Sequence, residues 1–369
     1  MSLPPCTMLF SYSASWRCTQ FSRLPFRFNL SPQTSHRFEA FRRNFSASRT
    51  ELSQTNVANV PSPIESVVSQ SGRTYSIEKV LQQKESPPRH VYLATAGGER
   101  YVLKDLSQFS FALYQDLYGR LRDSPYLRLS CDCIPEQSIF VYRYFSDHLL
   151  NLAQEDPPLP CIKRILKDAL RGLADLHDQD IVHTDIKPNN VLVQRKDPSS
   201  MIIQQVQLAD LEDSAYVPPE YDIVGKQAGN WMWRSPEAHA SGSVNKPSDM
   251  FSFGVMCIYA VHKKILFAVG EDELAEGEEV LAHVLERQIS YFADEEGLAG
   301  LLKHLGDSPW VQIFGVIRDG FGKENPRKPV SMWKDVDVDL KHLVGGLTNF
   351  DPAKRLTARQ TLEHQWFKD

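Results

Sequence analysis

The sequence predicts an α+β protein built from two lobes, a small one rich in β-strands and a larger one that is mostly helical. The predicted strands come first along the chain, with one helix among them, and the predicted helices follow. This order differs from the alternating strands and helices of a parallel α/β sheet. The length of 369 residues, with 42% hydrophobic residues, is enough for two buried cores. The expected lobes span about 75–145 and 146–367.

The first lobe is expected to begin with a meander of three strands. Its β-rich runs lie at 74–83, 90–96 and 100–106, and Pro- or Gly-containing segments separate them. Helical spacing of apolar residues at 109–122 predicts a helix. The run SIFVYRYF at 138–145 then predicts a fourth strand.

The second lobe is expected to be helical. In 161–179 the apolar residues form one continuous stripe at helical spacing, at positions 162, 165, 166, 169, 170, 173 and 176. The apolar run 251–261 is too short to span a membrane and predicts a buried helix.

The first fifty residues differ in composition from the rest of the chain. They hold seven Arg, no Lys and one acidic residue, Glu39, which gives a formal charge of +6, whereas the whole chain carries −5. Arg-rich, Ser-rich and acid-poor composition is typical of a mitochondrial transit peptide, so we expect one at 1–45 and a mitochondrial location. A disordered basic tail on a cytoplasmic protein is the alternative. Residues 46–74, rich in Ser, Asn, Gln and Pro, predict a flexible linker.

Composition excludes several classes of protein. The mild negative charge does not indicate a nucleic-acid binder. The six cysteines form no CxxC pair or Cys/His cluster, so we expect no zinc site. We expect no transmembrane segment, because no apolar run reaches 18 residues. The oligomeric state is left open.

One short segment carries most of the chemical signal. Residues 181–192 read IVHTDIKPNNVL and place a carboxylate (Asp185), an ammonium group (Lys187) and a carboxamide (Asn190) between two hydrophobic runs. Phosphoryl transfer needs positioned charges and a metal held by oxygen ligands. This mixture of groups therefore suits a site for a nucleotide and its metal ion.

The segment resembles the catalytic loop of eukaryotic protein kinases, whose pattern is H-R-D-L-x-x-x-N. Other segments resemble further landmarks of that family in the same order, namely VYLA at 91–94, VLK at 102–104, ADLED at 209–213, SPE at 235–237, SDMFSFGV at 248–255 and NFDPAKRLTARQTLEHQWF at 349–367. The resemblance covers about 75–367. It implies the bilobal protein-kinase fold, with a β-rich N-lobe and a helical C-lobe, and ATP and Mg²⁺ as cofactors.

The resemblance implies a role for each of the polar residues. Asp185 would accept the proton of the substrate hydroxyl, and Lys187 would place a cation at the γ-phosphate. Asn190 and Asp210 would bind Mg²⁺, and Lys104 would hold the α- and β-phosphates. The nucleotide site implied by the family would be formed by Leu81, Val91, Val102, Lys104, Tyr144, Phe145, Asn190, Leu192 and Asp210.

The resemblance also implies two scaffold contacts. Glu237 and Arg355 would form a buried ion pair between the SPE segment and the late helices. Asp249 would accept hydrogen bonds from backbone N–H groups of the catalytic loop. Core packing is the alternative explanation for each of these residues.

The chain departs from the family pattern in several places. The segment QQKESPPRH at 82–90 has no glycine where a phosphate-binding glycine loop is expected, so phosphate contacts should be weaker or organised differently, with Arg89 or His90 as compensating cations. Glu212 replaces the glycine of the D-F-G motif. In the family a helix glutamate pairs with the lysine that corresponds to Lys104. Its place in this chain falls near Tyr114, and the nearest acidic residue is Asp116.

One further departure concerns regulation. Thr184 occupies the position at which the family has an arginine that binds a phosphate group on the activation loop. We therefore expect that phosphorylation of this loop is not the switch.

Together these features predict a serine/threonine protein kinase. Lys187 lies two residues after the predicted catalytic Asp185, and a lysine at this position resembles the pattern of serine/threonine kinases. We therefore expect Ser and Thr hydroxyls of protein substrates as acceptors. The alternative is a pseudokinase that binds partners without efficient catalysis. A third hypothesis is phosphorylation of a small molecule inside mitochondria. Retention of Lys104, Asp185, Asn190 and Asp210 favours catalysis.

Overall fold

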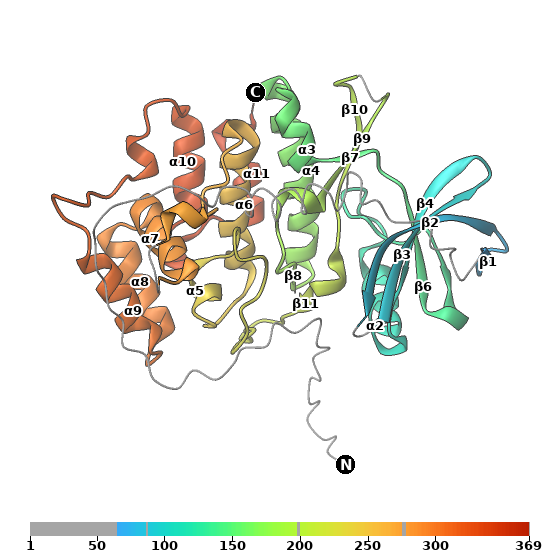
Figure 1. Cartoon of the computed structure of the whole chain (residues 1–369), viewed down its shortest axis with the longest axis horizontal. Coiled ribbons are helices and arrows are strands. Elements are labelled where there is room, and N and C mark those ends of the chain that lie inside the picture. Colours follow the sequence, from blue (N-terminus) through green and yellow to red (C-terminus); the bar gives the residue numbers. More distant parts are fainter. Residues whose placement is uncertain (1–64, 86–87, 198–199, 275–277, 369) are drawn as a thin grey trace, which may run out of the picture. The chain divides into compact units, whose positions relative to one another are not determined.

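The computed structural model describes residues 65–85, 88–197, 200–274 and 278–368 (Figure 1). The chain divides into two compact units. Among the described residues, the strand unit contains those up to Gly119 together with Ser130–Tyr144, and the helical unit contains Arg120–Leu129 and those from Phe145 onward. The predicted transit peptide at 1–45 lies outside the described residues.

The strand unit contains an antiparallel sheet of six strands in the order β1-β2-β3-β4-β6-β5. Its elements are β1 Ser66–Val68, β2 Thr74–Glu85, β3 Pro88–Ala96, β4 Glu99–Asp105, α2 Gln108–Leu121, β5 Asp132–Ile134, the 3₁₀ turn η1 Pro135–Gln137 and β6 Ile139–Arg143. The predicted meander, the predicted helix and the fourth predicted strand are confirmed.

The first strand corrects the linker prediction for 46–74. β1 pairs with β2 so that Val67 lies opposite Tyr75, and both side chains are buried. The prediction is therefore wrong for the last ten residues of this segment. Their polar composition hid a short strand that needs only one inward-facing apolar residue to join the sheet.

The segment at 82–90 forms part of a β-hairpin rather than a loop between shorter strands. β2 and β3 pair from Gln82 opposite Val91 to Glu85 opposite Pro88. The residues between them, 86–87, lie outside the described residues. Pro88 is the first residue of β3, a position that tolerates the missing backbone donor.

The two faces of the sheet have different partners. One face forms a core of buried residues, which includes Tyr92, Leu103 and Val141. On the opposite face α2 packs against β6, where the rings of Phe111 and Phe140 are stacked with their centroids 4.4 Å apart. The predicted nucleotide-binding residues of β3 and β4 lie on this second face, as described below.

The helical unit is built around α4 and α6. Its helices are α3 Leu149–Leu152, α4 Leu159–Asp178, α5 Pro236–His239, α6 Lys246–His262, α7 Val280–Phe292, α8 Glu295–Leu305, α9 Trp310–Asp319, α10 Val338–Leu347 and α11 Ala358–Leu362. Its strands are β7 Asp147–His148, β8 Ile181–Val182, β9 Val191–Arg195, β10 Ile203–Leu208 and β11 Ala215–Tyr216. The 3₁₀ turns are η2 Ala153–Glu155, η3 Pro188–Asn190, η4 Leu211–Asp213, η5 Glu271–Glu273, η6 Val330–Met332, η7 Pro352–Lys354 and η8 Gln365–Phe367.

The two central helices follow their sequence patterns. Every position of the apolar stripe predicted for α4 is buried. In α6 the residues from Ser248 to Ala260 are all buried, which confirms the predicted buried helix. Asn245 caps α6 by accepting the Lys246 N–H at 2.7 Å. Within the described ranges, no helix has the length and apolarity needed to cross a membrane.

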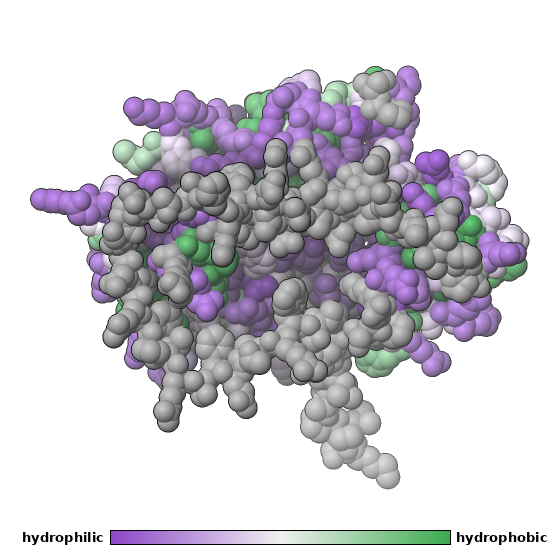
Figure 2. All heavy atoms as spheres, in the orientation of Figure 1, coloured by the Kyte–Doolittle hydropathy of each residue, from purple (hydrophilic) through white to green (hydrophobic). Residues whose placement is uncertain are grey.

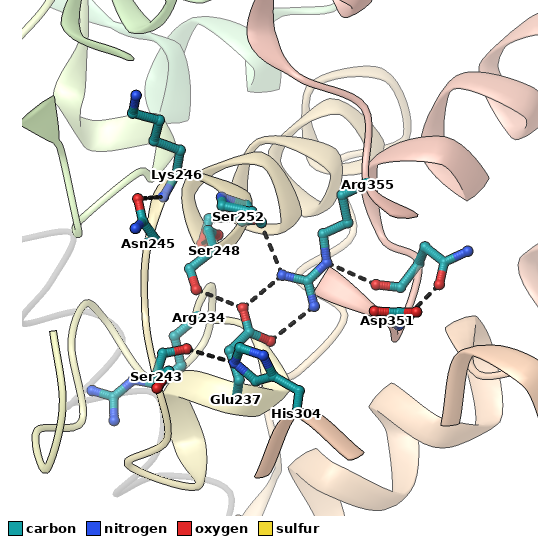
Figure 3. Close-up of polar contacts among 12 residues, drawn as sticks. Arg234, Glu237, Ser243, Asn245, Lys246, Ser248, Ser252, His304, Asp351 and Arg355 are labelled. Carbon is teal, nitrogen blue, oxygen red and sulfur yellow. Dashed lines mark hydrogen bonds and ion pairs between the residues drawn. The ribbon is translucent and has the colours of Figure 1, made fainter. Parts of the chain in front are cut away.

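A buried ion pair joins α5 to the turn η7 (Figure 3). The Arg355 guanidinium donates to both carboxylate oxygens of Glu237, at 2.6 and 2.8 Å, and the two side chains are 0% and 1% exposed. Burial alone would raise the pKa of Glu237, but Arg355 and the Ser248 hydroxyl lower it to about 2. The predicted pair is confirmed.

The visible surface is mainly polar. In Figure 2, hydrophilic residues predominate among the coloured part of the chain, and hydrophobic residues form small separate patches. This distribution is ordinary for a folded protein surface.

Candidate active site

The catalytic loop lies between β8 and β9 in the helical unit. Asp249 of α6 fixes its first residues, because Oδ2 accepts the His183 N–H at 2.7 Å and Oδ1 accepts the Thr184 N–H at 2.9 Å. His177 Nε2 lies 3.0 Å from the same Oδ2. Asp249 is buried, and its side-chain oxygens are satisfied by these hydrogen-bond partners. The predicted role of Asp249 is confirmed.

Thr184 adopts a backbone conformation that is unfavourable for its residue type. Its φ is 68°, in the left-handed region, where a β-branched residue is strained. Its hydroxyl donates to the Asp213 carbonyl at 2.9 Å. The threonine that replaces the expected arginine therefore ties the catalytic loop directly to η4.

Asp185 is surrounded by donors. Lys187 Nζ donates to its Oδ2 at 2.5 Å, and Asn190 Nδ2 donates to the same oxygen at 3.2 Å. The Asn230 N–H donates to Oδ1 at 3.1 Å. The side chain is buried, so these contacts hold it in one orientation. The predicted catalytic base, lysine and asparagine are thus brought together.

The strands β9 and β10 bring Asp210 next to Asn190. Val191 lies opposite Leu208, and the Ala209 N–H continues the ladder by donating to the Asn190 carbonyl at 2.8 Å. Buried His183 donates from Nε2 to the Ala209 carbonyl at 3.0 Å. Asp210 follows directly, with φ 67°, which Asp tolerates better than most residues.

Sequence reasoning missed three residues beside Asp185. They belong to the segment 210–237, which we call the activation segment. Gly229 has φ 82°, and a Cβ placed there would lie 2.3 Å from the Thr184 carbonyl oxygen. Asn230 contacts Asp185 through its backbone, as described above. The dipeptide Gly-Asn is a turn signal, which could have identified this position.

Arg234 is the third of these residues. Its guanidinium donates to the Gly229 carbonyl and, at 3.1 Å, to Gln227 Oε1. Burial lowers the pKa of Arg234 to about 10, although Asp185 acts to raise it. Arg234 therefore stays protonated at neutral pH and adds a positive charge near the predicted base.

The predicted nucleotide-binding residues of the strand unit share one face of its sheet. Val91 lies opposite Lys104, and Leu93 lies opposite Val102, so Val91, Val102 and Lys104 point to the same side. Lys104 Nζ lies 5.7 Å from the ring centroid of Tyr142. This arrangement suits a site with an apolar wall and one cation.

The remaining predicted nucleotide-binding residues differ in exposure. Leu81 lies at an irregularity of β2 and is 37% exposed, and Tyr144, the last residue of the strand unit, is 36% exposed. Phe145 and Leu192, of the helical unit, are buried and half-buried, respectively. That these residues join Lys104, Asn190 and Asp210 around one nucleotide stays a prediction.

Two of the predicted departures can be located in the strand unit. Tyr114 is buried on α2, whereas Asp116 lies on its exposed face, since residues two positions apart on a helix point in different directions. His90 donates its backbone N–H to Asp105 Oδ1 at 2.5 Å, and its ring Nδ1 lies 2.9 Å from Oδ2. The side chain proposed as a compensating cation therefore has an acidic partner.

The residues present fit a magnesium ion. Asn190 uses its amide nitrogen on Asp185, including a 2.8 Å bond to the Asp185 carbonyl, and this leaves the amide oxygen to bind a cation. Asp210 supplies a carboxylate. The part of the chain that the structure describes holds no group of three or more His, Cys, Asp or Glu side chains suited to a metal. Mg²⁺ at a nucleotide needs only one or two protein carboxylates, because phosphates and water complete its shell.

The family model described as protein kinase domain matches residues 63–367. The chain is 26% identical over 234 residues to cyclin-dependent kinase B2-1 of Oryza sativa subsp. japonica, a match that covers 62% of each protein. It is 28% identical over 214 residues to cell division control protein 2 homolog 3 of Trypanosoma brucei brucei, covering 56% of this chain and 60% of that protein. The matches thus span about three fifths of each relative's length.

A solved structure supports the same fold. The chain superposes on a chain of the yeast RNA Pol II CTD kinase CTDK-1 complex with a TM-score of 0.60 and 18% sequence identity. The match covers 76% of this chain and 90% of that chain. At this identity the comparison concerns the fold alone.

Proposed function

Because this chain belongs to the eukaryotic protein kinase superfamily, we propose that it transfers the γ-phosphoryl group of ATP to serine and threonine hydroxyls of protein substrates. The observation that carries the proposal is the set of donors around Asp185. Lys187, Asn190 and the Asn230 N–H hold the carboxylate in a fixed orientation inside the helical unit.

Each residue has a defined task in this reaction. Asp185 would accept a hydrogen bond from the substrate hydroxyl and later its proton. Lys187 would shift from Asp185 Oδ2 toward the γ-phosphate and offset its negative charge. Asn190 and Asp210 would hold Mg²⁺ through oxygen atoms, and Lys104 would bind the α- and β-phosphates. Bound Mg²⁺ would neutralise charge that develops on the phosphate oxygens.

A pseudokinase is the second candidate. It is favoured by Glu212 at the position of a glycine and by the absence of glycine between Leu81 and Val91. A scaffold, however, has no chemical need to hold Asp185 against Lys187 and Asn190 with these short contacts. Catalysis is therefore the function that the site supports best.

The deciding experiment measures phosphate transfer from γ-labelled ATP to a mixture of protein substrates, with and without Mg²⁺. Asp185→Asn should lower the rate by roughly 100-fold or more, because general base catalysis and charge are lost together. Asp307→Asn, an exposed aspartate between α8 and α9, is the matched control and should keep the full rate.

Two results would contradict the proposal. Equal transfer by the Asp185→Asn variant and the unchanged protein would show that the label does not come from this site. Phosphotyrosine as the main product in a phosphoamino-acid analysis would contradict the assignment to Ser and Thr.

A further inference from the structure

A pocket on α4, away from the catalytic loop, is lined mainly by positively charged side chains. Its volume is 350 Å³. Four cationic side chains line it, with a single carboxylate and with apolar groups from the start of α4 and from the turn η8. The polar residues of this α4 basic pocket are Lys163, Arg164, Lys167, Asp168 and Arg171.

The cations of the pocket contact groups of the helical unit. Arg171 donates to Asp168 Oδ1 at 2.7 Å, and Arg164 Nε lies 3.9 Å from Oδ2. Lys167 donates to the carbonyl of Phe367 at 2.8 Å, and Lys163 Nζ lies 5.3 Å from the ring centroid of Trp366. The lining contains four cations and one carboxylate, although the chain as a whole carries a net charge of −5.

The stability of the helix does not explain this row of charges. Lys163, Lys167 and Arg171 follow one another at intervals of four residues, so their side chains lie on one face of α4. Like charges at this spacing destabilise a helix. The row places three positive charges side by side on one face of α4, where they can meet a negatively charged ligand.

The lining also indicates the kind of ligand. Leu159, which is 44% exposed, Pro160 and Phe367 add apolar surface beside the cations. A pocket of limited volume with an apolar wall suits peptide side chains better than the continuous backbone of a nucleic acid, which is tracked by an extended basic groove. Complementary charge requires acidic groups on the ligand.

We propose that the α4 basic pocket binds an acidic segment of a partner protein, in which Asp or Glu side chains flank an apolar residue. With a rise of 1.5 Å per residue, Lys163 lies about 22 Å along the helix from Asp178, the end of α4 that leads to the catalytic loop. The pocket is therefore a docking site separate from Asp185. The proposal does not depend on catalysis.

The test measures binding of a fluorescent peptide to the full chain by anisotropy. The probe is a Leu-Phe pair flanked by four Glu residues on each side. Arg164→Glu should weaken binding about tenfold, because Arg164 is 50% exposed and its reversal places a negative charge at the pocket. Lys323→Glu, an exposed lysine after α9, makes the same change in net charge and should leave binding unchanged.

The control variant also accounts for the basic N-terminal residues. Any binding of the peptide to these residues is the same in both variants, so only the difference between Arg164→Glu and Lys323→Glu reports on the pocket. Lys167→Gln, which removes a cation without reversing charge, should weaken binding about threefold. Thermal unfolding checks that each variant is folded, and a loss of binding counts as support only when the unfolding midpoint is kept.

Three outcomes would overturn the proposal. The first is equal binding by folded Arg164→Glu, folded Lys167→Gln and Lys323→Glu. The second is equal affinity for a peptide in which Gln replaces every Glu. The third is tighter, Arg164-dependent binding to oligo-dT or to phosphatidylserine vesicles, which would assign the pocket to a different class of partner.

Discussion

At the scale of single residues, the contact between Gly229 and Thr184 joins the activation segment to the catalytic loop. The Gly229 backbone approaches the Thr184 carbonyl so closely that no side chain fits between them. The next residue, Asn230, donates its N–H to Asp185. The position of the predicted base therefore depends on a residue that has no side chain of its own.

Gly229→Ala should be far more damaging than Gly225→Ala. Both glycines have positive φ, 82° and 68°, but a Cβ at Gly225 meets no atom within 4 Å. Gly225→Ala should cost roughly 1–2 kcal/mol of stability from backbone strain alone. Gly229→Ala should cost at least about 3 kcal/mol and reduce phosphoryl transfer, because the Thr184 backbone must move. Urea unfolding and the transfer assay measure both effects, and equal costs at the two positions would contradict this account.

The buried ion pair makes a second prediction, which concerns pH. Glu237 has a pKa of about 2 in the fold, below its ordinary value of 4.5. The pair therefore stabilises the protein fully above about pH 5, and this contribution is lost as the pH falls below 4.5. Between pH 6 and pH 3.5 the free energy of unfolding should lose roughly 1.4 kcal/mol from this group.

Glu237→Gln tests this contribution. The difference in unfolding free energy between the unchanged protein and this variant should shrink as the pH is lowered from 6 to 3.5. Glu296→Gln, which removes a surface carboxylate paired with Lys354, is the exposed-pair control and should change the free energy of unfolding by less than about 1 kcal/mol. A constant difference for Glu237→Gln would show that the carboxyl is not held ionised by Arg355.

At the scale of elements, hydrogen bonds fasten the activation segment to the rest of the helical unit. Ile223 and Val244 exchange both backbone hydrogen bonds, each 2.9 Å long. Asn245 Nδ2 donates to the Tyr221 carbonyl at 2.8 Å and to Asp222 at 3.0 Å. With Thr184 bonded to η4, these contacts can replace the arginine–phosphate contact of other kinases.

We therefore predict activity that does not depend on phosphorylation of this segment. Phosphatase treatment, or replacement of Ser214 by Ala and of Tyr216 and Tyr221 by Phe, should change the transfer rate less than about twofold. Asn245→Ala should lower it about tenfold by loosening the segment, since a small displacement of catalytic groups is costly. A large loss on phosphatase treatment would restore phosphorylation as the switch.

Element types could be predicted from the sequence because their signals are local. The stripe of α4 and the strands of the meander need only the spacing of apolar residues. The strand β1 could not be recognised from the local sequence, because it forms only through the pairing that sets Val67 opposite Tyr75. The hairpin at 82–90 was hidden by prolines, which break a strand in general but not at its first residue.

At the scale of the whole molecule, the chain combines a basic N-terminal segment with a negatively charged remainder. The first fifty residues carry +6, so the remainder carries −11. The location of the protein stays a proposal, because 1–64 lie outside the described residues. Import into mitochondria would use the basic charge and the segment HRFEAFRRNF at 36–45. Its sequence predicts a short amphipathic helix with phenylalanines on one face and arginines available to the other.

A reporter fusion tests this proposal. Residues 1–60 fused to a fluorescent protein should direct it to mitochondria. The same fusion with Arg37, Arg42 and Arg43 changed to Gln should remain in the cytosol, because the cationic face of the predicted helix is lost. Diffuse fluorescence of the unchanged fusion would contradict a targeting role.

The sequence by itself determined the order and type of most elements, the family resemblance and the chemical groups of the site. These depend on spacing along the chain, so His183, Asp185, Lys187 and Asn190 could be identified from one segment. The resemblance also implied that Asp249 holds the backbone of the loop, from a position more than sixty residues away. Only the tertiary structure showed that the Gly229 backbone approaches Thr184 and that the Asn230 N–H donates to Asp185. These contacts arise from the packing of the activation segment against the loop, which the local sequence does not specify.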